Sequence, residues 1–306
     1  MSALSLASPT MLDSLDESKL RFVDVNGIRT RYYDDGQGDP LILLHGGHFG
    51  SLYSLDSWSL NLPGLAQNFR VFALDKLGQG YTDNPETDAD YTYDRLFAHT
   101  CDFFRSLNIE RAHWVGHSRG AHLATYMALE HPEWVKSLIM VDTSTTAPEV
   151  SGIPSGQFYA DVEAGIPSDA DDGTIVRAEP RAQAYNSDQI TDNYMGRMEQ
   201  ILQLPKMKEA RDKMTVLNGS TWNPSLNRKR AEVLERIDSS ELQTPTLIMW
   251  GFNDQSAPLP LGIQLYEKLC KTVPNTELHV VNGAGHYSFR EQPVAFNSTL
   301  ASFCNR

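Results

Sequence analysis

The sequence predicts an α/β fold with a mostly parallel central sheet flanked by helices. Two observations support this. Continuous apolar runs of strand length recur along the chain, and segments with helical spacing alternate with them. A parallel sheet is covered by helices on both faces, so its strands are apolar throughout rather than alternating. The 306 residues, 41% of them hydrophobic, suffice for one large domain or for a domain with an insertion.

The first predicted element is a hairpin in residues 21–33, where Asn26-Gly27 separates two β-type runs. Apolar runs predict buried strands at 41–45, 70–75, 137–142, 246–251 and 277–281, and a short strand that ends in a turn is expected at 113–118. Helical spacing of apolar residues predicts helices at 92–107, 119–131, 259–271 and 291–303.

The stretch 146–240 breaks this alternation. It is rich in polar residues, Gly and Pro, then helical, and it has no apolar strand run. We therefore expect residues 1–145 and 240–306 to form the core and residues 146–239 to form an inserted helical cap. An insertion between two strands is well placed to cover a site at their carboxyl ends.

The strongest chemical signal is Gly116-His117-Ser118-Arg119-Gly120, between a predicted strand and a predicted helix. A Gly-x-Ser-x-Gly pattern in that context is typical of a sharp turn that presents a nucleophilic serine. The free N–H groups at the start of the helix favour developing negative charge. Ser118 is therefore the predicted nucleophile.

A serine hydroxyl needs a base, and the base is oriented by an acid. His286 follows the last predicted strand in a Gly-Ala-Gly-His loop and is the predicted base. Asp254 follows the strand before it and is the predicted acid, which gives the order Ser, acid, His. Asp142, which also follows a strand, is the rival acid.

The oxyanion of a tetrahedral intermediate needs two donors. We assign them to the backbone N–H groups of Arg119 and Gly47, the latter in the loop after the strand at 41–45. His45 is expected to be structural. Two histidine groupings, His45 with His48 and His113 with His117 and His122, lack a carboxylate or cysteine to complete a metal site, so we expect neither metal nor cofactor.

Together these motifs resemble the α/β-hydrolase superfamily over nearly the whole chain, and within it the meta-cleavage product hydrolases, which cleave a C–C bond in ring-opened aromatic compounds. The resemblance is carried by RFVDVNGIRTRYY (21–33), LILLHGG (41–47), RVFALDKLGQGYTD (70–83), ITDNYMGRMEQI (190–201), WGFNDQSAP (250–258) and GAGH (283–286). The resemblance implies that Arg197 binds a substrate carboxylate. It also implies the α/β fold described above and a reaction that needs no cofactor.

The chain departs from that family at several positions. His117 and Arg119 stand where Asn and Met are usual, Asp56 or Ser57 replaces a second Asn, and Tyr287 replaces a common Trp. These departures favour an ester substrate, such as a monoalkyl phthalate, over the C–C substrate, which remains the alternative. We expect Arg197, Gly46, Ser57, His117 and Tyr287 to contact the substrate.

Composition excludes several other classes. A formal net charge of -13 argues against nucleic acid and anionic membranes as partners, and leaves a small molecule. Three scattered cysteines, no signal-like start and no long apolar run are typical of a cytoplasmic protein.

Two alternatives within the same fold concern the function. A non-catalytic ligand receptor is the alternative to an enzyme, and Ser118 argues against the dehalogenases and epoxide hydrolases, which use an aspartate at this position. The oligomeric state, including a homo-oligomer, stays open.

Overall fold

The computed structural model describes residue 13 and residues 15–153 and 156–306. In this part of the chain eight strands form one sheet in the order β1-β2-β4-β3-β5-β6-β7-β8. The β1–β2 and β2–β4 pairs are antiparallel and the remaining pairs are parallel. The strands are β1 Leu20–Val25, β2 Ile28–Asp35, β3 Pro40–Leu44, β4 Arg70–Leu74, β5 Ala112–His117, β6 Val135–Val141, β7 Thr246–Gly251 and β8 Thr276–Val281. The predicted α/β architecture is confirmed.

The predicted hairpin is present between β1 and β2. Asn26 has φ 54° and Gly27 has φ 88°, so both turn residues lie in the left-handed region that a tight hairpin turn requires. The flanking residues Val25 and Ile28 pair directly. The predicted helices are also present: α2 Tyr93–Ser106, α3 Arg119–Glu130, α9 Leu259–Leu269, and α10 Ser288–Glu291 followed by α11 Pro293–Cys304.

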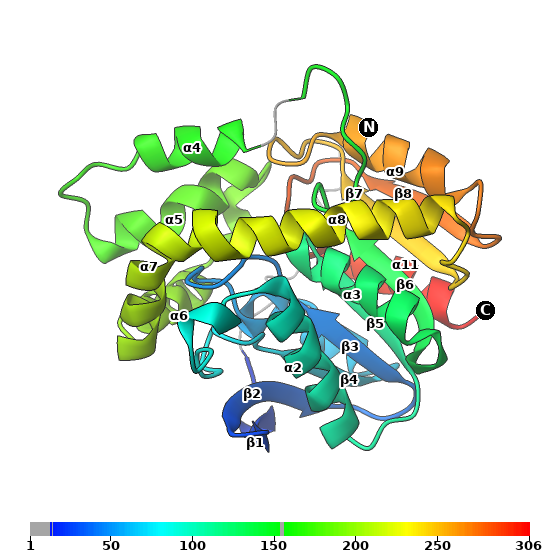
Figure 1. The fold of residues 1–306 in the computed structure, drawn as a ribbon, viewed down its shortest axis with the longest axis horizontal. Coiled ribbons are helices and arrows are strands. Elements are labelled where there is room, and N and C mark those ends of the chain that lie inside the picture. The colour runs from blue at the N-terminus through cyan, green and yellow to red at the C-terminus, as the bar shows by residue number, and fades with distance from the viewer. Residues whose placement is uncertain (1–12, 14, 154–155) are drawn as a thin grey trace, which may run out of the picture.

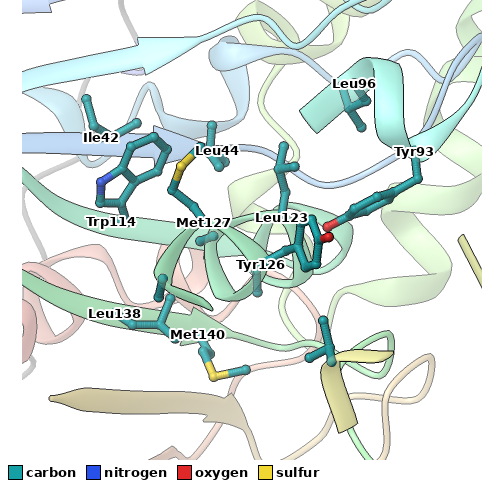
Figure 2. Close-up of a cluster of buried hydrophobic side chains, with 14 of the residues drawn as sticks. Ile42, Leu44, Tyr93, Leu96, Trp114, Leu123, Tyr126, Met127, Leu138 and Met140 are labelled. Atoms are coloured by element: carbon teal, nitrogen blue, oxygen red, sulfur yellow. The ribbon is translucent and has the colours of Figure 1, made fainter. Parts of the chain in front are cut away.

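The core lies on both faces of the sheet. Figure 2 shows one face, where Trp114 of β5 and Met140 of β6 lie beside Met127 of α3. Neighbouring residues of the same strands, such as Val115 and Ile139, belong to a second buried cluster on the other face. Because both faces are buried, the central strands contain continuous apolar runs, such as residues 41–44 of β3 and 138–141 of β6.

One predicted strand is present but is less buried than expected. Residues 277–281 were expected to form a buried strand, but most of β8 is partly exposed. The reason is its position, since β8 pairs only with β7 and forms an edge of the sheet.

Between β6 and β7 the described residues of the inserted stretch form helices and no strand, as expected. They are α4 Gln157–Ala164, α5 Asp172–Gln183, α6 Asp192–Leu202, α7 Pro205–Leu217 and α8 Asn223–Asp238. Figure 1 shows α4 to α7 gathered at one side of the sheet, with α8 leading back across the molecule past α3. Within the residues described, no helix has the length and apolar character needed to span a membrane.

Candidate active site

Ser118 occupies a sharp turn between β5 and α3. Its φ of 54° and ψ of -123° are strained for a residue with a side chain. The two flanking glycines are required by close contacts. A Cβ on Gly116 would lie 2.2 Å from the Gly120 carbonyl oxygen, and one on Gly120 would lie 2.4 Å from the Leu44 carbonyl oxygen. The Gly-x-Ser-x-Gly spacing therefore follows from backbone packing against β3.

The imidazole of His286 is held by Asp254. His286 Nδ1 donates to Asp254 Oδ2 at 2.7 Å, and both residues are buried. The other carboxylate oxygen, Asp254 Oδ1, accepts from the backbone N–H groups of Ser256 and Ala257, each at 2.8 Å. Both oxygens are thus oriented, so the ring is fixed in the tautomer that leaves Nε2 without a proton.

Ser118 and His286 line the same small cavity, together with Gly46, Gly47, Tyr53, His117, Arg119, Tyr159, Glu179, Gln183 and Tyr287. The described structure contains no hydrogen bond between Ser118 Oγ and His286 Nε2. Contacts of this kind are often long in a site without substrate. The fold thus places Ser118 and the His286–Asp254 pair close to one another, although they are far apart in the sequence.

Asp142, the rival acid, lies nearby but has other partners. Its Oδ1 accepts from the Gly251 N–H at 2.7 Å, and its Oδ2 is 2.7 Å from Ser288 Oγ. Burial and the neighbouring Asp254 carboxylate raise the pKa of Asp142. Asp142 thus has partners of its own, whereas Asp254 is the carboxyl that contacts the histidine.

The loop after β3 is shaped by buried polar contacts. Gly47 has φ 76°, and a Cβ there would lie 2.2 Å from Ser51 Oγ. Lys76 Nζ donates to the Gly47 carbonyl at 3.1 Å. His45 Nε2 accepts from the Lys76 N–H and its Nδ1 donates to the Gly46 carbonyl, so the structural role expected for His45 is confirmed. Gly46 and Gly47 both line the small cavity with Ser118.

The first N–H groups of a helix have no acceptor within it. Arg119 begins α3 directly after Ser118, so its N–H lies at such a free helix end. A Cβ placed on Gly46 would be 3.1 Å from the Ser118 Cβ, which shows how closely the loop after β3 approaches the serine. Gly47 and Arg119 both line the small cavity with Ser118, and their role as oxyanion donors stays a prediction.

His117 and Tyr287 also reach the small cavity, as predicted. His117 Nε2 donates to the His286 carbonyl at 2.8 Å, so its other nitrogen carries no proton. Burial, together with the neighbouring His286, holds the pKa of His117 well below its usual value of 6.5. His117 is thus a neutral residue that supports the loop carrying His286.

Two predicted substrate contacts are not at the cavities. Arg197 Nη2 is 2.9 Å from Asp13 Oδ1, its Nε is 3.4 Å from Asp56 Oδ1, and the residue lines none of the three cavities around Ser118. Ser57 is likewise absent from their walls, and its Oγ lies 3.0 Å from the Tyr194 hydroxyl. Arg197 thus pairs with two buried carboxylates, although its Nε has no hydrogen-bond partner in the described chain. That these two side chains contact the substrate stays a prediction.

Two larger cavities, of about 570 and 480 Å³, adjoin the small one. Sequence reasoning missed several of the side chains that line them, namely Tyr53, Tyr159, Glu179 and Arg230. Burial raises the pKa of Glu179, and this effect outweighs Tyr53, Arg119 and His286, which lower the pKa. Three of the four come from the inserted helices, where no motif distinguished them from surface residues.

The inserted helices contact the histidine loop directly. The His286 N–H donates to the Gln183 carbonyl at 3.0 Å. Glu291 bridges the two parts, since its Oε1 accepts from the Gly285 N–H at 2.8 Å and its Oε2 accepts from the Asn186 N–H at 2.6 Å. The end of α5 is therefore fixed against the loop that carries His286.

Comparison with known proteins agrees with this fold. A family model described as alpha/beta hydrolase fold matches residues 39–293. The 2-hydroxymuconate semialdehyde hydrolase of Pseudomonas sp. (strain CF600) is 29% identical over 278 residues, covering 90% of each chain. The 2-hydroxy-6-oxo-6-(2'-aminophenyl)hexa-2,4-dienoic acid hydrolase of Metapseudomonas resinovorans is 26% identical, covering 94% of this chain and 91% of that protein. The solved meta-cleavage product hydrolase of Pseudomonas fluorescens IP01 superimposes with a TM-score of 0.75 at 27% identity, covering 93% of this chain and 97% of that one.

Proposed function

Since this chain belongs to the α/β-hydrolase fold family, we propose that it is a serine hydrolase that cleaves a C–C bond in a ring-fission dienoate. The observation that carries the proposal is the buried His286–Asp254 pair facing the same cavity as Ser118. The similarity to two hydrolases of ring-fission products, along nearly their whole length, supports this substrate class over the ester.

In the proposed reaction Ser118 Oγ attacks the carbonyl carbon next to the C–C bond that is cleaved, while His286 Nε2 takes the serine proton. The N–H groups of Arg119 and Gly47 stabilise the oxyanion. The C–C bond then breaks, and its electron pair passes to the dienoate carbon, which is protonated. Water activated by His286 releases the acyl group from Ser118. One water is consumed, its OH going to the acyl carbon and its hydrogen to the leaving carbon.

We propose that residues 146–239 act as the cap of this site. Gln183 of α5 accepts from the His286 N–H, and the Tyr53 hydroxyl donates to Gln183 Oε1 at 3.2 Å. Tyr159 of α4 lines all three cavities. A cover over the nucleophile excludes water, which strengthens electrostatic stabilisation inside the site.

A second candidate is the hydrolysis of an aromatic half-ester such as a monoalkyl phthalate. It is favoured by His117 and Arg119, which occupy positions where the resembling family usually has Asn and Met. The leaving group of an ester is an alkoxide, which His286 alone can protonate to the alcohol. This reaction therefore does not require Asn and Met at those two positions. The same triad and the same oxyanion donors would serve it.

One parallel assay separates the two candidates. Purified protein is given a ring-fission dienoate, 2-hydroxymuconate semialdehyde, and separately a monoalkyl phthalate, and the products are measured by chromatography. We expect dienoate cleavage with kcat/KM at least tenfold above that for the half-ester. Release of phthalate alone would overturn the C–C proposal in favour of the ester. Turnover of neither substrate, with retained labelling of Ser118 by an organophosphate, would reject both substrate classes.

The acid limb of the pH profile is expected to lie above pH 6.5. Burial disfavours the protonated ring, but the Asp254 carboxylate outweighs this effect and raises the pKa of His286 above 6.5. Since the base must be unprotonated, kcat/KM should fall as the pH drops through that raised pKa. The profile is measured from pH 5 to 9 in a constant-ionic-strength buffer.

The matched control for this profile is Asp102→Asn. Asp102 pairs with Arg105 at the surface, away from the carboxylates that raise the pKa of His286, so the acid limb should stay in place. An acid limb below pH 6.5 in the unmodified protein would show that Asp254 does not raise the pKa of His286 in this way.

A further inference from the structure

The 570 Å³ cavity is lined by Arg119, next to Ser118 in the chain, and by a second arginine, Arg230 of α8. Arg119 also lines the other two cavities, so its side chain stands where all three meet. Both arginines are partly buried. Two cations from different elements, the start of α3 and the middle of α8, are thus directed to one space next to the predicted nucleophile.

Neither guanidinium forms an ion pair in the described part of the chain. Among the residues described, no carboxylate oxygen lies within 4.0 Å of either one. The buried Nε of Arg119 has no hydrogen-bond partner in the described chain. Arg230 donates only its Nε, to the Thr145 carbonyl at 2.8 Å. The acids in the same wall, Glu149 and Asp161, are exposed, where solvent and salt screen their charge.

The remaining wall indicates what kind of anion would fit. It contains apolar side chains that would contact the body of an organic molecule: Ala147, Val150, Ile153, Phe158, Leu226 and Leu261. A guanidinium matches the planar geometry of a carboxylate and binds it with charge-assisted hydrogen bonds. The combination is suited to an organic acid with an apolar body.

We propose that Arg119 and Arg230 form a carboxylate-binding subsite in the 570 Å³ cavity, which holds the acid group of the substrate beside Ser118. Arg119 then has two separate roles, because its N–H serves the oxyanion and its guanidinium serves the substrate carboxylate. The subsite takes the place of Arg197, whose charge is engaged by Asp13 and Asp56. The identity of the bound acid as substrate rests on the proposed function, whereas the binding of a carboxylate does not.

The electrostatics of the site are consistent with a carboxylate bound between Arg119 and Arg230. Burial lowers the pKa of Arg230, Glu149 raises it, and the nearby positive charge of Arg119 lowers it further. The two cations therefore repel one another, and an anion between them relieves the repulsion. Glu179 lines the 480 Å³ cavity and the small cavity but not the 570 Å³ cavity, and its carboxyl disfavours a substrate carboxylate in the first two.

The test is a binding titration that does not require turnover. Benzoate and its neutral analogue benzamide are each titrated by ligand-observed NMR into the unmodified protein and into Arg119→Gln, Arg230→Gln and Arg228→Gln. The last is the matched control, since Arg228 lies on the same helix α8 but is exposed and pairs with Asp94. Unfolding midpoints confirm that each variant is folded.

We expect benzoate to bind the unmodified protein more tightly than benzamide, and each of Arg119→Gln and Arg230→Gln to weaken benzoate about tenfold or more while benzamide changes little. Arg228→Gln should retain the preference. No preference for benzoate in the unmodified protein, or an unchanged preference in both cavity variants, would overturn the subsite. A retained subsite in a protein that cleaves no dienoate would overturn the proposed function alone.

Discussion

Ser118→Ala is expected to lower kcat for the preferred substrate on the order of 10⁶-fold, as removal of the nucleophile does in other serine hydrolases. The covalent step is lost, and the histidine has no hydroxyl to activate. The rest of the site is unaffected, because alanine keeps the turn between β5 and α3 and the Arg119 N–H. Substrate binding should therefore be retained, and single-turnover kinetics would show it as a bound but unreacted complex.

The control is Ser239→Ala, an exposed serine whose hydroxyl donates to the Glu235 carbonyl at the end of α8. Its kcat should match that of the unmodified protein. A Ser118→Ala variant with kcat within tenfold of the unmodified protein would show that Ser118 is not the nucleophile. A different nucleophile would then be the interpretation to pursue.

Arg290→Ala is expected to reduce the free energy of unfolding by about 3–5 kcal/mol. Arg290 is fully buried, and its guanidinium donates to the Ser57 carbonyl, to Ser59 Oγ and to both the side chain and the carbonyl of Gln189. It also pairs with Asp13 Oδ2 at 3.1 Å. Its loss leaves acceptors without donors and removes one of the two cations that neutralise the buried Asp13 carboxylate.

Denaturant-induced unfolding measures this loss, with Arg105→Ala as the control because that arginine pairs with Asp102 at the surface. A surface pair contributes about 0–1 kcal/mol, so the control should be nearly neutral. Adding Asp13→Ala to Arg290→Ala should recover part of the lost stability, since the uncompensated carboxylate is gone. A loss below 1 kcal/mol in the single variant would show that this buried network does not stabilise the fold.

Patterns that are local in sequence predicted the strands, the hairpin and the turn at Ser118. The apolar runs of the central strands reflect burial on both faces, and Asn26-Gly27 reflects the left-handed backbone that the turn needs. The glycines around Ser118 are explained by backbone contacts that no larger residue allows. In each case the cause acts within a few residues or through a repeating environment, so it leaves a readable pattern.

The assignment of the acid depended on both levels. The sequence favoured Asp254 because of its place after the strand before the last, but Asp142 offered the same signal one strand earlier. The tertiary structure distinguishes them by contact, since Asp254 meets His286 at 2.7 Å whereas Asp142 is bound to Gly251 and Ser288. A pattern of residue types gives no information about which of two carboxyls reaches a ring more than 30 residues away.

By itself the sequence determined the α/β sheet, the helical character of the insertion and the three residue types of the site with their order along the chain. Only the tertiary structure decided the charge pairing around them. Arg197 meets a carboxylate 184 residues away in Asp13, while Arg119 and Arg230, more than 100 residues apart, face one cavity without a carboxylate partner in the described chain. The physical reason is that an ion pair depends on distance in space and on burial, and neither is encoded in the spacing of residues along the chain.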